Sequence, residues 1–198
     1  MDAPLPFFPL GILLLPGEQQ YLHIFETRYR QLLDDLENGL SEFVIPFVRD
    51  HRMEQVGSVV RLAKVVDKHP NGTSDIIIES VGNAIVQSYS EQMYGKKYPG
   101  GYIRKLHWNA SDLEASPEVL RSFEGYERRS GNLNDTATYS NDVHQIQLAI
   151  ALHLNPHQKL AFIKGDREKR NRIIETQLHH MELLLNQEEK RFGAIYLN

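Results

Sequence analysis

The sequence of 198 residues contains no cysteine, which excludes disulfide bonds, thiol nucleophiles and thiolate metal ligands and fits a reducing compartment. It also lacks a basic excess, because the formal net charge is -4, whereas general nucleic-acid binders carry surplus Lys and Arg. No apolar run approaches the roughly 18 to 20 residues that span a bilayer. Asp2 stands where a signal peptide has basic residues, and Pro4, Pro6 and Pro9 interrupt the first apolar run. We therefore expect a cytoplasmic protein with no membrane partner.

Motifs that carry chemistry are absent too. The sequence has no Walker A pattern, no G-x-S-x-G nucleophile elbow and no H-E-x-x-H metal motif. Among the nine histidines, His179 and His180 are adjacent and point about 100° apart on a helix. His153 and His157 have helical spacing, but Pro156 interrupts the helix between them. The sequence therefore predicts no catalytic residue, no cofactor and no metal site, and we expect the protein not to be an enzyme.

What is present in the first half is a series of short apolar segments. The run from Phe7 to Leu15 is closed by the turn-forming pair Pro16-Gly17. Pro46 cannot donate a ladder hydrogen bond, so its strand should be an edge or carry a bulge. Asn71-Gly72 predicts a hairpin, because both residues tolerate positive φ. Residues 49–55 should be a loop, and Gly82-Asn83 should break a strand. The expected strands cover residues 7–15, 20–25, 43–48, 56–66, 75–81, 84–89 and 102–108, with one helix over 26–36 that stops at Asn38-Gly39.

The second half changes to helical signals. Ser116 and Asn155 each precede a proline, the combination of an N-cap with proline at the first helical position. The expected helices cover residues 117–129, 141–154 with Ser140 or Asn141 as the cap, 156–164, and 167–191 with Asp166 as the cap, between a polar linker at 130–139 and an extended tail at 192–198. The buried stripe of the last helix should comprise Ile173, Ile174, Gln177, Leu178, Met181, Leu184 and Leu185. Together the halves predict an α+β protein, with a small and mostly antiparallel β-barrel plus one helix in residues 1–110 and a helical bundle in residues 111–198.

The N-terminal segment also resembles a known family. Phe-Pro-Leu-Gly at 8–11, Leu-Pro-Gly at 15–17, Leu-His-Ile-Phe-Glu at 22–26 and Arg-Tyr-Arg at 28–30 match, in order and spacing, the N-terminal substrate-recognition domain of Lon proteases. The signature residues are Pro9, Gly11, Pro16, Gly17, His23, Phe25, Glu26, Arg28 and Tyr29. The match continues loosely through the strand at 56–62, the hairpin at 67–78 and the helices after 116. It departs at Thr27, where the family usually has proline, at 81–84 and in the 130–139 linker.

This resemblance implies a PUA-like β-barrel followed by a helical bundle, and a role in recognising unfolded or damaged substrates. The ATPase and Ser-Lys protease domains of the full-length enzymes have no counterpart in the sequence. The first hypothesis is therefore a non-catalytic module that binds exposed hydrophobic peptide segments or a partner protein, such as a protease or chaperone. Two alternatives stay open: an RNA-binding PUA-like protein, and a component or regulator of an ATP-dependent protease.

Candidate binding residues lie near the end of the first half. Tyr89, Tyr94, Tyr98, Tyr102 and Trp108 cluster beside Lys96 and Lys97. Such aromatic and basic residues can stack RNA bases, line an apolar peptide groove, or simply close the barrel core. A peptide could also add to a free sheet edge, for which the Pro46 strand is the candidate.

The signature residues have structural interpretations. We expect Glu26 to cap the first helix and an arginine, Arg28 or Arg30, to tie that helix to the barrel, although the same residues could contact a partner. His23 lies between two apolar residues of a strand and should be a hydrogen-bonded, half-buried histidine rather than a ligand.

Overall fold

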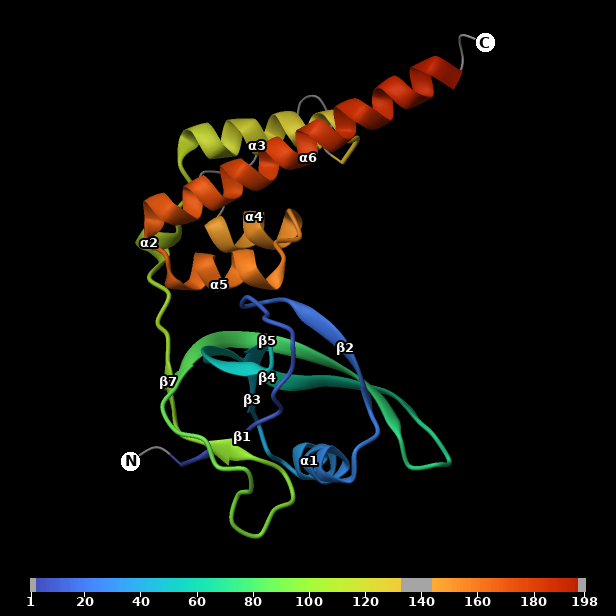
Figure 1. Ribbon diagram of the computed structural model, residues 1–198, viewed down its shortest axis with the longest axis vertical. Helices are drawn as coiled ribbons and strands as arrows, with labels where there is room; N and C mark the ends of the chain where they lie inside the picture. The colour runs from blue at the N-terminus through green and yellow to red at the C-terminus, as the bar shows by residue number, and fades with distance from the viewer. Residues whose placement is uncertain (1–2, 133–143, 196–198) are drawn as a thin grey trace. The chain divides into compact units, whose positions relative to one another are not determined.

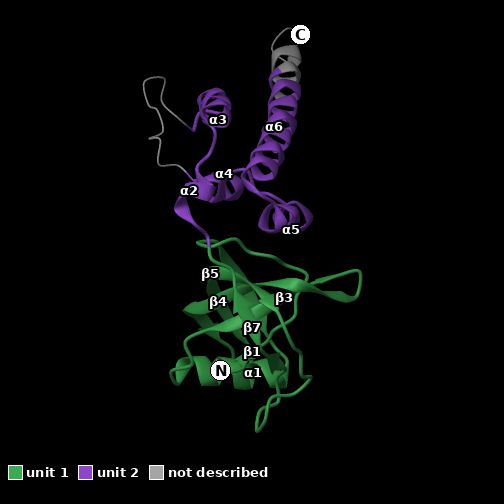
Figure 2. Ribbon diagram, turned by 90° about the vertical axis from the view of Figure 1, so that its left-hand side faces the viewer, with its two compact units in different colours: residues 1–107 green, residues 108–198 purple. Residues whose placement is uncertain are grey.

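The computed structural model describes residues 3–132 and 144–195. The chain divides into two compact units, residues 1–107 and 108–198, which Figure 2 shows in separate colours. The first unit holds the strands and one helix, and the second holds the remaining helices (Figure 1). The predicted α+β class, with strands followed by helices, is confirmed. The predicted cap at Ser140 or Asn141 and most of the predicted 130–139 linker lie outside the described residues.

A curled antiparallel sheet forms the first unit, with strand order β2-β5-β4-β3 and with β7 also paired to β5. Its elements are β2 (Gln19–Ile24), β3 (Phe43–Arg49), β4 (Arg52–Lys68), β5 (Ser74–Val86) and β7 (Ile103–Lys105), while β1 (Leu5–Pro6) pairs with β6 (Gly100–Gly101). The predicted break at Gly82-Asn83 is wrong, because β5 passes through both residues. Val59 pairs with Gly82 and Val60 with Ser80, so one bulged residue absorbs the irregularity. The last strand is shorter than the predicted 102–108.

The N-terminal segment is not the regular strand predicted for residues 7–15. It makes single parallel bridges to β3, at Phe7 with Val44 and at Leu10 with Phe47. The Leu10 backbone N–H donates to the Pro46 carbonyl at 3.2 Å, and the Val48 N–H donates to the Leu10 carbonyl at 2.8 Å. Proline at position 9 has no N–H to continue a ladder. The segment therefore covers the outer edge of β3 without forming a full strand.

A buried polar clamp holds this segment further along. The Ser58 hydroxyl accepts from the Leu14 N–H at 2.8 Å and donates to the Leu14 carbonyl at 3.0 Å. The Asn83 side-chain amide donates to the same carbonyl at 2.8 Å. Ser58 and Asn83 are both fully buried. These bonds satisfy backbone groups that the irregular segment would otherwise bury unpaired.

Two turns of the first unit test the predictions made from the sequence. The Pro16-Gly17 turn is confirmed, since the Glu18 N–H donates to the Leu15 carbonyl at 3.1 Å and Gly17 has φ of 91°. The predicted loop at residues 49–55 is wrong. There, β3 turns directly into β4 through Asp50 and His51, with φ of 50° and 60°. Such left-handed residues suit the tight turns that match strand twist.

The hairpin predicted at Asn71-Gly72 is confirmed, since this turn joins the antiparallel strands β4 and β5. Of Asn71 and Gly72, only Gly72 has positive φ, at 80°. The Asn71 side-chain oxygen instead accepts from the Thr73 N–H at 3.0 Å and from its hydroxyl at 2.9 Å. Asparagine therefore stabilises this turn through its side chain rather than its backbone.

Helix α1 (Thr27–Glu37) packs its apolar face on the sheet. Its buried residues are Tyr29, Leu32, Leu33 and Leu36, which recur at helical spacing in the sequence. The Asn38-Gly39 stop is confirmed, with Gly39 at φ of 108°. Tyr29 stacks on Phe8 with ring centroids 3.7 Å apart, and burial raises the pKa of Tyr29 to about 12. The core of this unit therefore lies between α1, the N-terminal segment and the inner face of the sheet.

The second unit is organised on one long helix. Its elements are α2 (Ala110–Leu113), α3 (Pro117–Arg129), α4 (Gln145–Ala151), α5 (Pro156–Lys164) and α6 (Arg167–Ile195). Helices α3, α4 and α5 each contact α6. The predicted caps are confirmed: Ser116, Asn155 and Asp166 each accept a hydrogen bond from a backbone N–H in the first turn that follows. No helix in residues 3–132 or 144–195 combines the length and apolar composition needed to cross a bilayer.

Several predicted limits in this unit are wrong. Helix α4 begins at Gln145, after His144 in the N-cap position. Helix α6 continues to Ile195, where an extended tail from 192 was predicted. Of the predicted buried stripe, Ile174 and Leu178 are buried but Leu184 is 43% exposed. The middle of α6 therefore packs on its neighbours over a narrower face than the apolar pattern indicated.

Candidate functional site

A cavity of about 380 Å³ opens on the first unit. Three of the five predicted aromatic residues line it: Tyr89, Tyr94 and Tyr102. Tyr89 and Tyr102 are 44% and 46% exposed, and Tyr94 is fully exposed. Met93 adds a flexible thioether side chain to the same wall. Large side chains that remain exposed around a cavity are typical of binding surfaces, so this cavity is the candidate site.

Two glycines of β6 let the cavity wall form. Gly100 exchanges both backbone hydrogen bonds with Ser90, at 2.8 and 3.0 Å. A Cβ atom on Gly100 would overlap the Met93 thioether, and one on Gly101 would overlap the carbonyl oxygen of Ser88. Only glycine permits such close backbone approach. The segment carrying Tyr89 can therefore lie directly against β6.

Tyr98 does not belong to this cavity. It is 2% exposed, and its hydroxyl donates to Asp35 of α1 at 2.7 Å. The Lys96 ammonium pairs with the same carboxylate at 2.8 Å. Burial alone would raise the pKa of Asp35, but these two hydrogen bonds outweigh it and lower the pKa. Burial and the bond to Asp35 raise the pKa of Tyr98. Tyr98 and Lys96 therefore fasten the segment that precedes β6 to α1.

Trp108 belongs to the second unit and is not one of the residues that line the cavity. The guanidinium group of Arg170 stands 5.0 Å from the centroid of the Trp108 ring, and the Phe162 ring centroid is 6.3 Å from it. The same guanidinium donates to the Asp112 carbonyl at 3.1 Å. Trp108 is thus engaged in the packing of its own unit.

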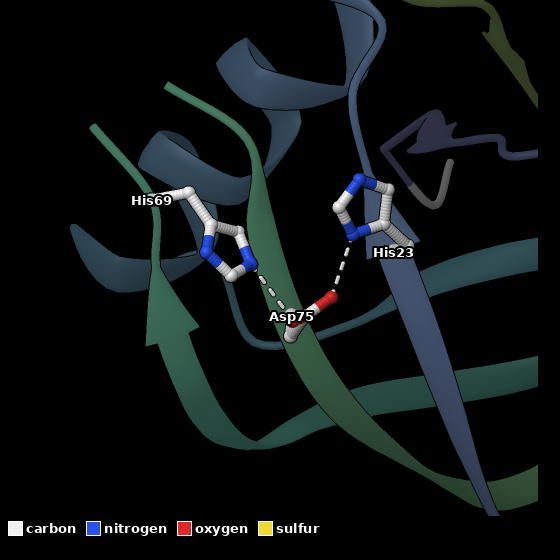
Figure 3. A group of neighbouring side chains, drawn as sticks. All are labelled: His23, His69 and Asp75. Atoms are coloured by element: carbon white, nitrogen blue, oxygen red, sulfur yellow. Dashed lines mark hydrogen bonds and ion pairs between the residues drawn. The ribbon is translucent and has the colours of Figure 1, made fainter. Parts of the chain in front are cut away.

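A separate polar cluster lies where β2 meets β5 (Figure 3). His23 Nδ1 is 2.6 Å from Asp75 Oδ1, and His69 Nε2 is 2.8 Å from Asp75 Oδ2. These hydrogen bonds, with a third from the Tyr21 hydroxyl, lower the pKa of Asp75 to about 2. Asp75 therefore stays ionised between two imidazoles, and the three side chains form a set of potential metal ligands.

His23 makes the expected hydrogen bond, with 49% of its side chain exposed. The prediction that Glu26 caps the helix is wrong. Glu26 occupies the N-cap position of α1 but makes no capping bond with its side chain, which pairs with Arg28 at 2.8 Å. Arg30 is the arginine that reaches the sheet, because its guanidinium lies against Gly72 in the β4–β5 turn.

As predicted, the Pro46 strand β3 ends the strand order of its sheet and carries a bulge between Pro46 and Val48. Its edge is not free for a peptide, however, since the N-terminal segment hydrogen-bonds to it. Among the described residues, β2 pairs with β5 alone and leaves its other edge unpaired. Tyr21 and Phe25 on and beside this strand are 51% and 60% exposed. The available edge for strand addition is therefore β2.

Sequence reasoning missed Met93, Gly100 and Gly101 in the cavity, and His69 and Asp75 in the polar cluster. The Gly-Gly pair at 100–101 was the available signal for the first group, since adjacent glycines mark close backbone approach. For the second group, a histidine and an aspartate flanked a predicted hairpin. No linear motif linked them to His23.

Comparison of the sequence with protein-family models and with curated proteins gives no match. Solved structures do match. The Lon N-terminal domain protein from Xanthomonas campestris has a TM-score of 0.65 and 25% identity, covering 90% of this chain and 98% of the other. The N-terminal domain of the Mycobacterium avium complex Lon protease has a TM-score of 0.60 and 13% identity, covering 89% and 98%.

The sheet with its covering helix, followed by helices packed on α6, is therefore the fold of Lon N-terminal domains. The resemblance carried by residues 8–30 agrees with it and is confirmed. The likeness to these domains extends over about nine-tenths of the chain, since the matches cover 90% and 89% of it.

Proposed function

We propose that the protein is a non-catalytic binding module that takes exposed apolar peptide segments into the cavity lined by Tyr89, Tyr94 and Tyr102. One observation carries the proposal: three tyrosines of the segment 89–102 converge on this cavity with large exposed areas. Tyrosine supplies a large contact area with little conformational entropy to lose. The cavity, at about 380 Å³, falls within the roughly 300 to 1,000 Å³ that binding pockets span.

The fold supports the same proposal in a second way. Substrate recognition is the role that the Lon resemblance implies, and peptides or unfolded segments of proteins are the corresponding partners. A protease or chaperone that receives the bound segment would be a further partner. If that partner is an ATP-dependent protease, the protein would act as its component or regulator. A cytoplasmic location stays a prediction from the sequence.

RNA binding receives less support from the charges. Lys96 pairs with Asp35, Lys105 with Glu42 at 2.6 Å, and Lys68 with Glu37 at 2.8 Å. Cations engaged with carboxylates are less available to phosphate groups. Of the two lysines that suggested a basic patch, Lys96 is therefore already occupied.

Fluorescence anisotropy with labelled peptides from an unfolded protein, such as casein, tests the proposal. Tyr94→Ala and Tyr102→Ala should each weaken binding by about fivefold or more, because truncating an interface anchor costs more than about 1 kcal/mol. Val66→Ala is the control, since Val66 is 45% exposed on β4, outside the residues that line the cavity. Affinity should change little with salt, whereas phosphate contacts give a steep dependence.

Absence of binding at high micromolar peptide by the folded protein would refute the proposal. Equal losses in Val66→Ala and Tyr94→Ala would also refute it, because they would place binding away from the cavity. A steep fall of affinity with salt for an RNA probe, together with no peptide binding, would favour the RNA-binding alternative.

A further inference from the structure

The cluster of His23, His69 and Asp75 has the composition and spacing of a metal site. One nitrogen from each imidazole and one carboxylate oxygen lie within 4.8 Å of one another. They come from three places in the fold: β2, the β4–β5 turn and β5. Figure 3 shows both rings directed at the Asp75 carboxylate from opposite sides. Two imidazoles and one carboxylate suit borderline transition metals such as Zn²⁺.

The backbone around the cluster is fixed by hydrogen bonds. His23 and Asp75 are a direct cross-strand pair in the β2–β5 ladder. The His69 N–H donates to the Thr73 carbonyl at 2.9 Å, and the Gly72 N–H donates to the His69 carbonyl at 2.9 Å. A preformed scaffold of this kind lowers the entropic cost of gathering the ligands.

Groups outside the three ligands orient them. Asp67 Oδ2 lies 3.6 Å from His69 Nδ1, on the ring nitrogen that does not face Asp75. Metal-binding histidines usually direct their second nitrogen to a carboxylate or carbonyl, which fixes the ring and its tautomer. The Tyr21 hydroxyl also bonds to Asp75. The carboxylate of Asp67 therefore stands beside His69 where the second nitrogen of a metal-binding histidine usually finds its partner.

We propose that His23 Nδ1, His69 Nε2 and one Asp75 oxygen bind a single divalent transition-metal ion of the Zn²⁺ class, with a fourth position open to water. Zn–N bonds of about 2.0–2.1 Å in a tetrahedron hold ligand atoms about 3.4 Å apart. The His23–Asp75 distance of 2.6 Å must therefore lengthen by less than about 1 Å, which small side-chain rotations supply. Binding requires that the coordinating atoms of His23, His69 and Asp75 carry no proton.

The half-exposed His23 leaves the fourth position accessible to solvent. The site is independent of the tyrosine cavity, because none of its three residues lines that cavity. Failure of either proposal therefore leaves the other standing.

Isothermal titration of the full chain with Zn²⁺ near neutral pH tests the site, with the visible absorption of bound Co²⁺ as a second measurement. The expected result is one ion per chain and a tetrahedral Co²⁺ spectrum. His69→Gln and Asp75→Asn should each weaken binding by at least about tenfold, the scale seen even for losses around a metal site. His179→Ala is the matched control, since His179 is an exposed histidine on α6, and it should bind as the unaltered protein does.

Circular dichroism of each variant establishes that the fold is retained, and Asp75→Asn nearly preserves side-chain shape if His69→Gln does not fold. Unchanged affinity in a folded Asp75→Asn variant overturns the proposal. An equal loss in His179→Ala overturns it as well, because binding would then belong to scattered surface histidines. Lack of binding at low millimolar Zn²⁺ has the same consequence.

Discussion

Replacing Gly101 by alanine should disrupt the wall of the tyrosine cavity. The added Cβ would overlap the Ser88 carbonyl oxygen and lie 2.9 Å from its carbon and 3.0 Å from the Phe7 ring. Neither neighbour can yield easily, because one is backbone and the Phe7 ring is fully buried. Overpacking of this kind costs about 1–3 kcal/mol, and the obstruction by backbone points to the upper part of that range.

Gly82→Ala is the matched comparison within the same unit. Gly82 also lies in a strand, but a Cβ atom there would meet nothing within 4 Å and its φ is not positive. Alanine restricts the unfolded chain, so stability should rise by as much as about 1 kcal/mol or stay the same. The two substitutions make the same chemical change in opposite steric surroundings.

Urea denaturation followed by far-UV circular dichroism measures both variants. Gly101→Ala should lower the midpoint of unfolding without changing the slope of the unfolding free energy against urea concentration. Gly82→Ala should not lower the midpoint. Far-UV dichroism is needed because the single tryptophan, Trp108, lies in the other unit and reports on that unit. Peptide affinity should fall in Gly101→Ala alone. Equal stability of the two variants would refute the steric reasoning.

Two further predictions concern buried polar contacts. Ser58→Ala should cost about 1–3 kcal/mol because it leaves the buried Leu14 N–H without its partner, while the exposed Ser41→Ala should stay within about 0.5 kcal/mol; equal midpoints in thermal denaturation would contradict this. Because folding lowers the pKa of Asp35, its stabilisation is complete above its unfolded pKa of about 4 and is lost as pH falls through the lower folded value. Asp35→Asn should therefore flatten, without abolishing, the fall of stability in acid, since the lowered pKa of Asp75 acts in the same direction; an unchanged acid slope would contradict this.

Local chemistry explains what could be predicted from the sequence. The Ser116-Pro117, Asn155-Pro156 and Asp166 signals each specify a helix start through bonds within one turn, and all three are present. The apolar spacing of α1 likewise selects its buried face without reference to the rest of the chain.

Errors arose where distant strands decide the local structure. Gly82-Asn83 resembles a break, but pairing with β4 carries β5 through it and a bulge absorbs the mismatch. Tyr94 and Tyr98 are the same residue type four positions apart, yet one is fully exposed and the other is buried against Asp35. The partner of Tyr98 lies 63 residues earlier, so sequence alone could not separate the two roles.

The N-terminal signature supplies only His23 to the polar cluster, but it also helps to set the strand register on which the cluster depends. His23 faces Asp75 only because β2 and β5 pair in one register. That register begins at the Pro16-Gly17 turn, where the Gly17 N–H donates to the Ser80 carbonyl and the Ser80 N–H donates to the Glu18 carbonyl, both at 2.8 Å. A slip of one residue would turn the side chains of β2 to the opposite face. The turn residues of the signature therefore determine whether His23 can reach Asp75 and His69.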